Sequence, residues 1–195
     1  WNPEEVVEKL INECEIDAIY INRSYSPKWK LRDDNILKIC DSHDIDFHSY
    51  QDFLLVEPND CDVRKVFTPF SKLWKKFLWN HLERFVIHDF NGDNTKWFVP
   101  NNLKKIHDII NVPNHTYWSI SFWHERMNRN FAHYDEQRNI PWIDGSTRLS
   151  PYIRFWIFSI REIYEKIKDN QVLLSEIIWR EFWYHIAYHF PLIYE

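Results

Sequence analysis

Glycine is almost missing from this chain, which has 2 glycines among 195 residues, whereas about 7% is usual. Phosphate-binding loops that are built from several glycines are therefore mostly excluded. Collagen-like and low-complexity classes are excluded too, because both need abundant glycine or proline and the chain contains 9 prolines.

Cysteine is also scarce, and no apolar run is long enough to cross a membrane. The chain contains 3 cysteines, an odd number without CxxC spacing, so neither a disulfide framework nor a zinc site is predicted. A membrane span needs about 18 apolar residues, and the richest stretch, 173–192, is interrupted by charged and histidine side chains. We expect a cytoplasmic protein in a reducing compartment.

Aromatic residues are abundant instead, with 11 Trp, 10 Tyr and 14 Phe. So much apolar surface excludes intrinsic disorder. The formal net charge is −5, and no excess of basic residues marks residues 116–195. Any binding to nucleic acid must therefore come from a local arrangement of side chains rather than from a broad basic field.

The first part of the chain alternates helix and strand signals. Apolar spacing predicts a helix over 3–14, a strand over 16–22 and a second helix from Asp33 onward. Short apolar runs at 45–47 and 53–56 are typical of further strands. This order predicts an α/β domain with a parallel sheet.

Strand signals stop after residue 115, and the remainder predicts helices alone. We expect helices over 118–138, 150–169 and 172–190, the last ended by Pro191. An earlier helix is expected from Thr68, with Phe70, Leu73, Trp74, Phe77 and Leu78 on it. The domains then follow as an α/β part over 1–57, a connector over 58–115 and a helical part over 116–195.

Residues 145–147, with the sequence Gly-Ser-Thr, precede the expected helix at Ser150. Backbone N–H groups, two hydroxyls and the helix dipole at this place suit a phosphate or pyrophosphate. The same residues also suit an ordinary helix N-cap. From these residues alone both interpretations stay open.

Four residues of the last expected helix have spacing that places them on one face: Glu176, Trp179, Arg180 and Trp183. One interpretation is structural, with Glu176 and Arg180 forming an ordinary ion pair. The other is a pocket with a flat aromatic wall and one proton-sharing group, suited to a heteroaromatic ligand or an extruded base.

Two smaller patterns complete the set of candidates. Tyr134 and Arg138 are four residues apart, so Arg138 could contact a phosphate and Tyr134 a ring or phosphate, or both could decorate a helix surface. His185 and His189 have the same spacing, but no HExxH motif or acid partner accompanies them. We therefore expect no metal site.

Together, the segments YDEQRNIP (134–141), GSTRLSPYIRF (145–155) and SEIIWREFWYH (175–185) resemble the photolyase/cryptochrome family, in particular its class I-like deoxyribodipyrimidine photolyases. The segments NRSYSP (22–27) and KVFTPFSKLW (65–74) are similar to the same family and stand in the same order. The resemblance implies an α/β antenna domain, a connector and a helical FAD-binding domain. Because it begins and stops partway through the family's domains, we expect the chain to be a fragment.

The resemblance also implies roles for individual residues. It implies that FAD contacts Tyr134 and is wrapped by Ser146, Thr147, Arg148, Leu149 and Ser150. It implies that DNA is contacted by Arg138, Glu176, Trp179, Arg180 and Trp183. Within that set, Glu176 would hydrogen-bond a pyrimidine dimer and Trp179 would stack on it. The implied partner is damaged DNA, and we expect a monomer.

The implied activity is repair of cyclobutane pyrimidine dimers by light-driven electron transfer from reduced FAD. A cryptochrome-like photoreceptor and an inactive fragment are the alternatives. Three positions depart from the family pattern: Trp156 stands where it has glycine, Leu173 where some members have a flavin-side tryptophan, and Trp29 where folate-binding members have an acid. A second antenna chromophore, of folate or deazaflavin type, is therefore left open.

Overall fold

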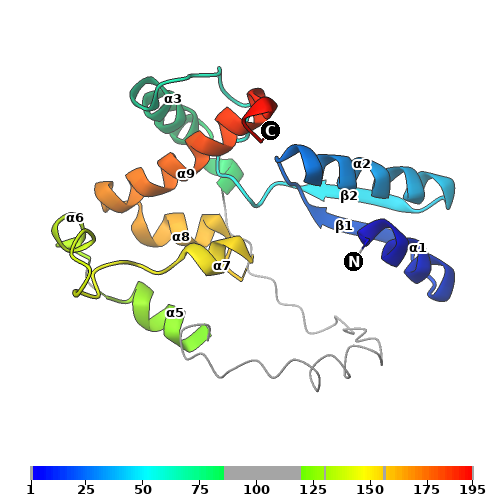
Figure 1. Ribbon diagram of the computed structural model, residues 1–195, viewed down its shortest axis with the longest axis horizontal. Coiled ribbons are helices and arrows are strands. Elements are labelled where there is room, and N and C mark those ends of the chain that lie inside the picture. The colour runs from blue at the N-terminus through cyan, green and yellow to red at the C-terminus, as the bar shows by residue number, and fades with distance from the viewer. Residues whose placement is uncertain (1, 86–119, 130, 156, 195) are drawn as a thin grey trace. The chain divides into compact units, whose positions relative to one another are not determined.

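The computed structural model describes residues 2–85, 120–129, 131–155 and 157–194. Of these, residues 2–85 and 158–194 form one compact unit, and residues 120–157 belong to a second. The predicted fold class is confirmed, because the chain combines a parallel sheet with helices (Figure 1).

The sheet of the first unit has two parallel strands, β1 (Ala18–Asn22) and β2 (Asp46–Tyr50). Ala18 pairs with Asp46 and Asn22 with Tyr50. Helix α2 (Pro27–Ser42) connects the strands and packs on the sheet (Figure 1). Helix α1 (Pro3–Glu13) precedes β1 and contacts α2. This is the crossover that parallel strands require.

The expected start of the second helix at Asp33 is wrong, because α2 begins six residues earlier, at Pro27. Ser26 has extended backbone angles, and proline follows at the first helical position. Proline suits this position because its fixed φ is already helical and no N–H is lost there. The Ser-Pro pair was therefore the better start signal.

The predicted strand at 53–56 is also wrong, because these residues form no regular element. Phe53, Leu54, Leu55 and Val56 are nevertheless buried. Burial in an apolar environment without backbone partners is costly. Gln51 donates to the carbonyls of Leu54 and Leu55, and side chains of a later helix supply further backbone partners.

Three longer helices complete the first unit: α3 (Phe67–Asn80), α8 (Ile160–Ile167) and α9 (Gln171–His189). Short 3₁₀ turns follow α3 at Leu82–Phe85 and α9 at Pro191–Tyr194. Helix α9 packs against both α3 and α8 (Figure 1). Asn170 caps α9 by accepting from the N–H groups of Val172 and Leu173, and the helix ends before Pro191, as predicted.

Two long helices predicted for the last 80 residues are each divided. Residues 150–169 form α7 (Ser150–Arg154), in the second unit, and α8, in the first. Ser159 starts α8 in a reciprocal capping box with Glu162, a signal that defines a new helix start. Residues 118–138 contain α5 (Ile120–Met127) and α6 (Tyr134–Gln137).

Some expectations fall outside the described residues, among them most of the connector and the Trp156 departure. The domain boundaries at 57 and 115 stay predictions. Among the helices that the structure describes, none is both long and apolar enough to span a membrane.

Candidate functional site

Helix α9 holds the buried segment 53–58 through side-chain hydrogen bonds. The carboxylate of Glu181, which is 0% exposed, accepts from the backbone N–H of Leu55 at 2.5 Å and of Val56 at 3.1 Å. It also accepts from the indole N–H of Trp74 in α3, at 2.5 Å. A buried carboxylate of α9 thus supplies the partners that a neighbouring strand would otherwise supply.

Other side chains of α9 donate hydrogen bonds to the carbonyl groups of the same segment. Arg180 donates to the carbonyl of Phe53 at 2.9 Å and His185 to that of Val56 at 2.9 Å. His189 donates to the carbonyl of Pro58 at 3.1 Å. His185 and His189, which are four residues apart on α9, therefore both hydrogen-bond to the backbone of this segment.

Burial shifts the protonation of two groups in this network in opposite directions. It raises the pKa of Glu181 to about 7, against the effect of the three N–H donors and Arg180. It lowers the pKa of His185 to about 4, against the effect of the Val56 carbonyl. Both shifts follow from the cost of placing a charge away from water.

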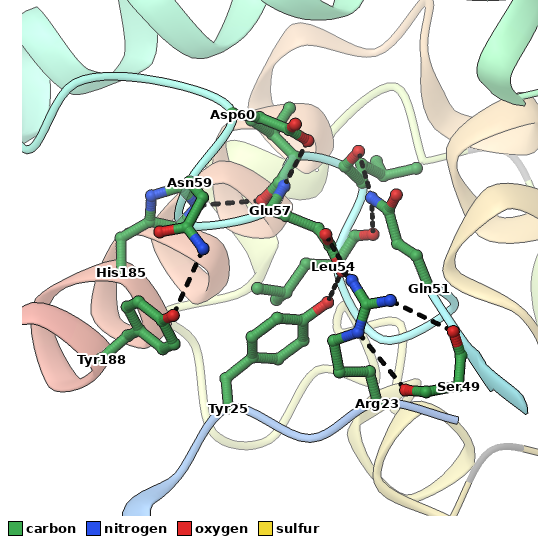
Figure 2. Close-up of polar contacts among 12 residues, drawn as sticks. Arg23, Tyr25, Ser49, Gln51, Leu54, Glu57, Asn59, Asp60, His185 and Tyr188 are labelled. Atoms are coloured by element: carbon green, nitrogen blue, oxygen red, sulfur yellow. Dashed lines mark hydrogen bonds and ion pairs between the residues drawn. The ribbon is translucent and has the colours of Figure 1, made fainter. Parts of the chain in front are cut away.

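A second polar cluster follows directly along the chain (Figure 2). Arg23 donates to both oxygens of Glu57 at 2.7 Å, and the hydroxyl of Tyr25 donates to the same carboxylate at 2.5 Å. Burial and this carboxylate raise the pKa of Tyr25 well above its usual value. A pocket of about 280 Å³ beside the cluster is lined by Arg23, Lys30, Glu57 and Tyr188, among others.

The other side of α9 exposes aromatic rings next to an acid. The indole of Trp179 is 36% exposed and that of Trp183 is 55% exposed, and their ring centroids lie 6.3 Å apart. Glu176 lies nearly one turn before Trp179 and is half-buried. Indoles are expensive to leave in water, so exposed neighbours beside an acid are typical of a binding surface.

The four residues predicted to share one face contact two different sets of neighbours. Trp179 stacks on Phe67 of α3, at 3.6 Å between ring centroids. The guanidinium of Arg180 instead lies over the rings of Phe53 and Tyr184, at 4.3 and 5.2 Å from their centroids. Arg180 thus contacts the 53–58 segment through Phe53, and its predicted contact with DNA stays a prediction.

In the second unit, Asp144 forms ion pairs with three arginines. Its carboxylate pairs with Arg126, with Arg129 at 2.9 Å and with Arg148 at 3.0 Å. Arg126 is 1% exposed and also donates to the carbonyl of Ser146. Hydrogen bonds from Arg126 chiefly lower the pKa of Asp144 to about 2. This network fixes the loop that begins at residue 144.

The residues predicted to contact FAD lie in and after that loop. Gly145 approaches Gln137 so closely that an added Cβ would lie 2.4 Å from the Gln137 Cβ. Thr147 accepts from the N–H of Leu149 at 3.4 Å, and Ser150 begins α7. Arg148 has a positive φ of 53°, a conformation that non-glycine residues rarely adopt.

A pocket of about 260 Å³ adjoins the same loop. It is lined by Arg129, Phe131, Tyr134, Gln137, Asp144 and Gly145. Tyr134 therefore lines a pocket next to Gly145, and its contact with FAD stays a prediction. Arg138 lies over the Tyr134 ring, at 5.7 Å from the centroid.

The predicted site residues are thus distributed over both units. Glu176, Trp179, Arg180 and Trp183 belong to the first, and Tyr134, Arg138 and residues 146–150 to the second. Sequence reasoning missed Glu181, Phe67 and the Arg126–Asp144 pair. The only signal for Glu181 in the sequence was its charge within an apolar helix. A charged side chain that is buried in such a helix needs hydrogen-bond or ionic partners.

Comparison with known proteins first defines the class of fold. The chain superimposes on an archaeal photolyase from Sulfolobus tokodaii with a TM-score of 0.65 and 24% identity, over 98% of this chain and 43% of the other. It superimposes on a cryptochrome from Synechocystis sp. PCC6803 with a TM-score of 0.62 and 18% identity, over 96% and 44%. The fold is that of part of a photolyase or cryptochrome.

Similarity in sequence points to the photolyases within this class of fold. A family model described as DNA photolyase matches residues 1–87. The deoxyribodipyrimidine photo-lyase of Alkalihalophilus pseudofirmus is 27% identical over 91% of this chain and 41% of its own length. The predicted resemblance to the photolyase/cryptochrome family is confirmed. The chain spans about 41–46% of the length of the curated relatives it matches.

Proposed function

We propose that this chain takes part in light-dependent repair of cyclobutane pyrimidine dimers, as part of a deoxyribodipyrimidine photo-lyase. The observation that carries the proposal is the exposed face of α9, where Trp179 and Trp183 stay accessible beside Glu176. The curated relatives that match the chain carry the same enzyme name. An extruded base requires flat rings for stacking and a polar group for recognition.

In this proposal Trp179 stacks on the dimer and Glu176 hydrogen-bonds to it. In its acid form the carboxyl group of Glu176 would donate its O–H to a pyrimidine oxygen on which negative charge develops, and such stabilisation is strong where water is excluded. Trp183 extends the aromatic surface and Arg138 would contact a DNA phosphate. Arg180 contributes indirectly, by fixing α9 against Phe53.

The 144–150 loop fits the phosphates of FAD by the chemistry of its donors. Ser146, Thr147 and Ser150 supply hydroxyls and Arg148 supplies a guanidinium, the groups that bind phosphate in proteins. Gly145 allows this backbone to lie against Gln137, and Tyr134 would contact the cofactor from the adjoining pocket. When bound and reduced, FAD supplies the electron that light makes available.

A cryptochrome-like photoreceptor is the second candidate, favoured by the similarity to the Synechocystis cryptochrome. It would use the same fold and flavin without needing an acid and indoles that recognise a lesion. Lesion binding therefore discriminates between the two candidates.

The test measures affinity for an oligonucleotide with one thymine dimer and for its undamaged counterpart. We expect the chain to prefer the dimer, and Trp179→Ala to weaken dimer binding by about 5- to 150-fold, because stacking of one base contributes about 1–3 kcal/mol. Trp79→Ala is the matched control, since Trp79 is an exposed indole of α3 outside the proposed site.

Equal affinities for damaged and undamaged DNA would contradict the repair proposal. Equal losses from Trp179→Ala and Trp79→Ala would contradict the assignment of Trp179. Little FAD is expected to stay with the 195-residue chain after gel filtration, and a stoichiometric yellow complex would refute that expectation.

A further inference from the structure

Phe67 makes a close ring contact with the indole that we assign to lesion binding. It is the first residue of α3, and its ring lies parallel to that of Trp179, with 3.6 Å between centroids and 3° between planes. Phe182 meets both rings edge-on, at 5.9 Å from Phe67 and 5.6 Å from Trp179. Two neighbouring rings, those of Phe67 and Phe182, thus define the plane of the indole.

We propose that Phe67 is a positioning residue that holds the Trp179 indole in the orientation needed to stack on an extruded pyrimidine. This inference rests on the proposed function. A partly exposed tryptophan can adopt several side-chain rotamers in water, and binding would have to fix one of them. The parallel Phe67 ring removes that freedom beforehand, and the exposed part of Trp179, 36% of the residue, is the surface left for a ligand.

The position of Phe67 is itself fixed by the contact between α3 and α9. Phe70 and Trp74 lie three and seven residues after Phe67, on the same side of α3, and both are buried. The Phe70 ring lies 5.3 Å from that of Phe182, and the Trp74 indole donates to Glu181. Since Phe182 and Glu181 both belong to α9, α3 presents Phe67 at a defined place beside Trp179.

Removing the stack while keeping an apolar side chain tests this role. We expect Phe67→Leu to weaken binding of the dimer oligonucleotide by about 2- to 10-fold, the range for loss of one aromatic pair, and to leave binding of undamaged DNA unchanged. Phe67→Tyr keeps the ring and should bind the dimer within about twofold of the unaltered chain. In a Trp179→Ala background, Phe67→Leu should have no further effect, because the partner it positions is gone.

Phe77→Leu is the matched control. Phe77 lies on the same helix, is half-buried like Phe67 and also stacks on a neighbouring ring, that of His81 at 4.1 Å. A loss in dimer binding shared by Phe67→Leu and Phe77→Leu would assign the effect to stability and overturn the proposal.

A second readout follows the indole directly. In chains labelled with 5-fluorotryptophan, the ¹⁹F resonance of Trp179, identified by its loss in Trp179→Phe, should shift in Phe67→Leu and return in Phe67→Tyr. An unshifted resonance, or unchanged dimer binding by Phe67→Leu in a chain that prefers the dimer, overturns the inference alone. Absence of any dimer preference in the unaltered chain overturns the proposed function instead.

Discussion

The two sides of α9 carry similar residue types, an acid and aromatic rings, but differ in which of them is buried. On one side Glu181 is fully buried, with three N–H donors around its carboxylate. On the other side Glu176 is half-buried and two large indoles stay exposed. Proteins normally expose acids and bury aromatic rings. The inversion indicates that the first side builds the fold, and in our proposal the second side binds the ligand.

The largest expected effect comes from removing the buried acid. Glu181→Ala leaves the N–H groups of Leu55 and Val56 and the indole of Trp74 without their partner, and we expect it to lower the free energy of unfolding by about 3–5 kcal/mol. Glu176→Ala is the matched change on the exposed side and should cost about 1 kcal/mol or less. Urea denaturation measures both, and equal losses would remove the distinction between the two sides.

The pH dependence of stability sharpens the comparison. The folded-state pKa of Glu181 is raised to about 7, so the stability from this group is full below its unfolded pKa and is lost as the pH rises through about 7. The pKa of His185 is lowered to about 4, so its contribution is present above the unfolded pKa and is lost as the pH falls through about 4. Between about pH 4.5 and 6.5, the contribution of Glu181 to the free energy of unfolding falls with pH while that of His185 rises.

Single substitutions should reveal each of these two pH dependences of the free energy of unfolding. In Glu181→Gln, the free energy of unfolding should rise with pH from about pH 5 to 6.5, by up to about 1.4 kcal/mol per pH unit. In His185→Gln, whose amide can still donate to the Val56 carbonyl, it should fall over the same range. Urea denaturation at several pH values measures these slopes. Parallel pH profiles of the two variants would show that these groups do not titrate as assigned.

Much of the α/β part and helix α9 could be predicted from local patterns. The β1–α2–β2 order follows from apolar spacing, and Asn170 and Pro191 mark the ends of α9. The segment 53–56 could not be assigned in this way, because the Glu181 carboxylate that accepts from its N–H groups lies about 125 residues later in the chain. A short apolar run predicts burial but does not reveal which groups will satisfy its backbone.

For the candidate site, the sequence indicated residue types but not their contacts. Trp179 and Trp183 are exposed and Tyr134 lines a pocket, and the roles assigned to these residues stay predictions. The engagement of Arg180 with Phe53 was missed, because spacing on a helix gives the direction of a side chain but not its partner. The capping box of Ser159 and Glu162 was present in the sequence and would have divided the 150–169 helix.

The smallest expected effect concerns the second unit. Asp144→Asn removes the charge that pairs with Arg126, Arg129 and Arg148, and since Asp144 is partly exposed we expect a loss of about 1 kcal/mol at neutral pH. Its folded-state pKa is lowered to about 2, so the loss should fade as the pH falls from about 4 toward 2. Thermal unfolding over this range is the measurement, and a loss that is constant with pH would contradict the ion-pair account.

The most direct measurement is a titration of the 5-fluorotryptophan-labelled chain with a thymine-dimer oligonucleotide, followed by ¹⁹F NMR. The exposed face of α9 predicts that the resonances of Trp179 and Trp183 shift with the dimer, while those of Trp74 and Trp79 stay in place and undamaged DNA leaves all four unmoved. Shifts confined to Trp74 or Trp79, or identical shifts with damaged and undamaged DNA, would contradict the account.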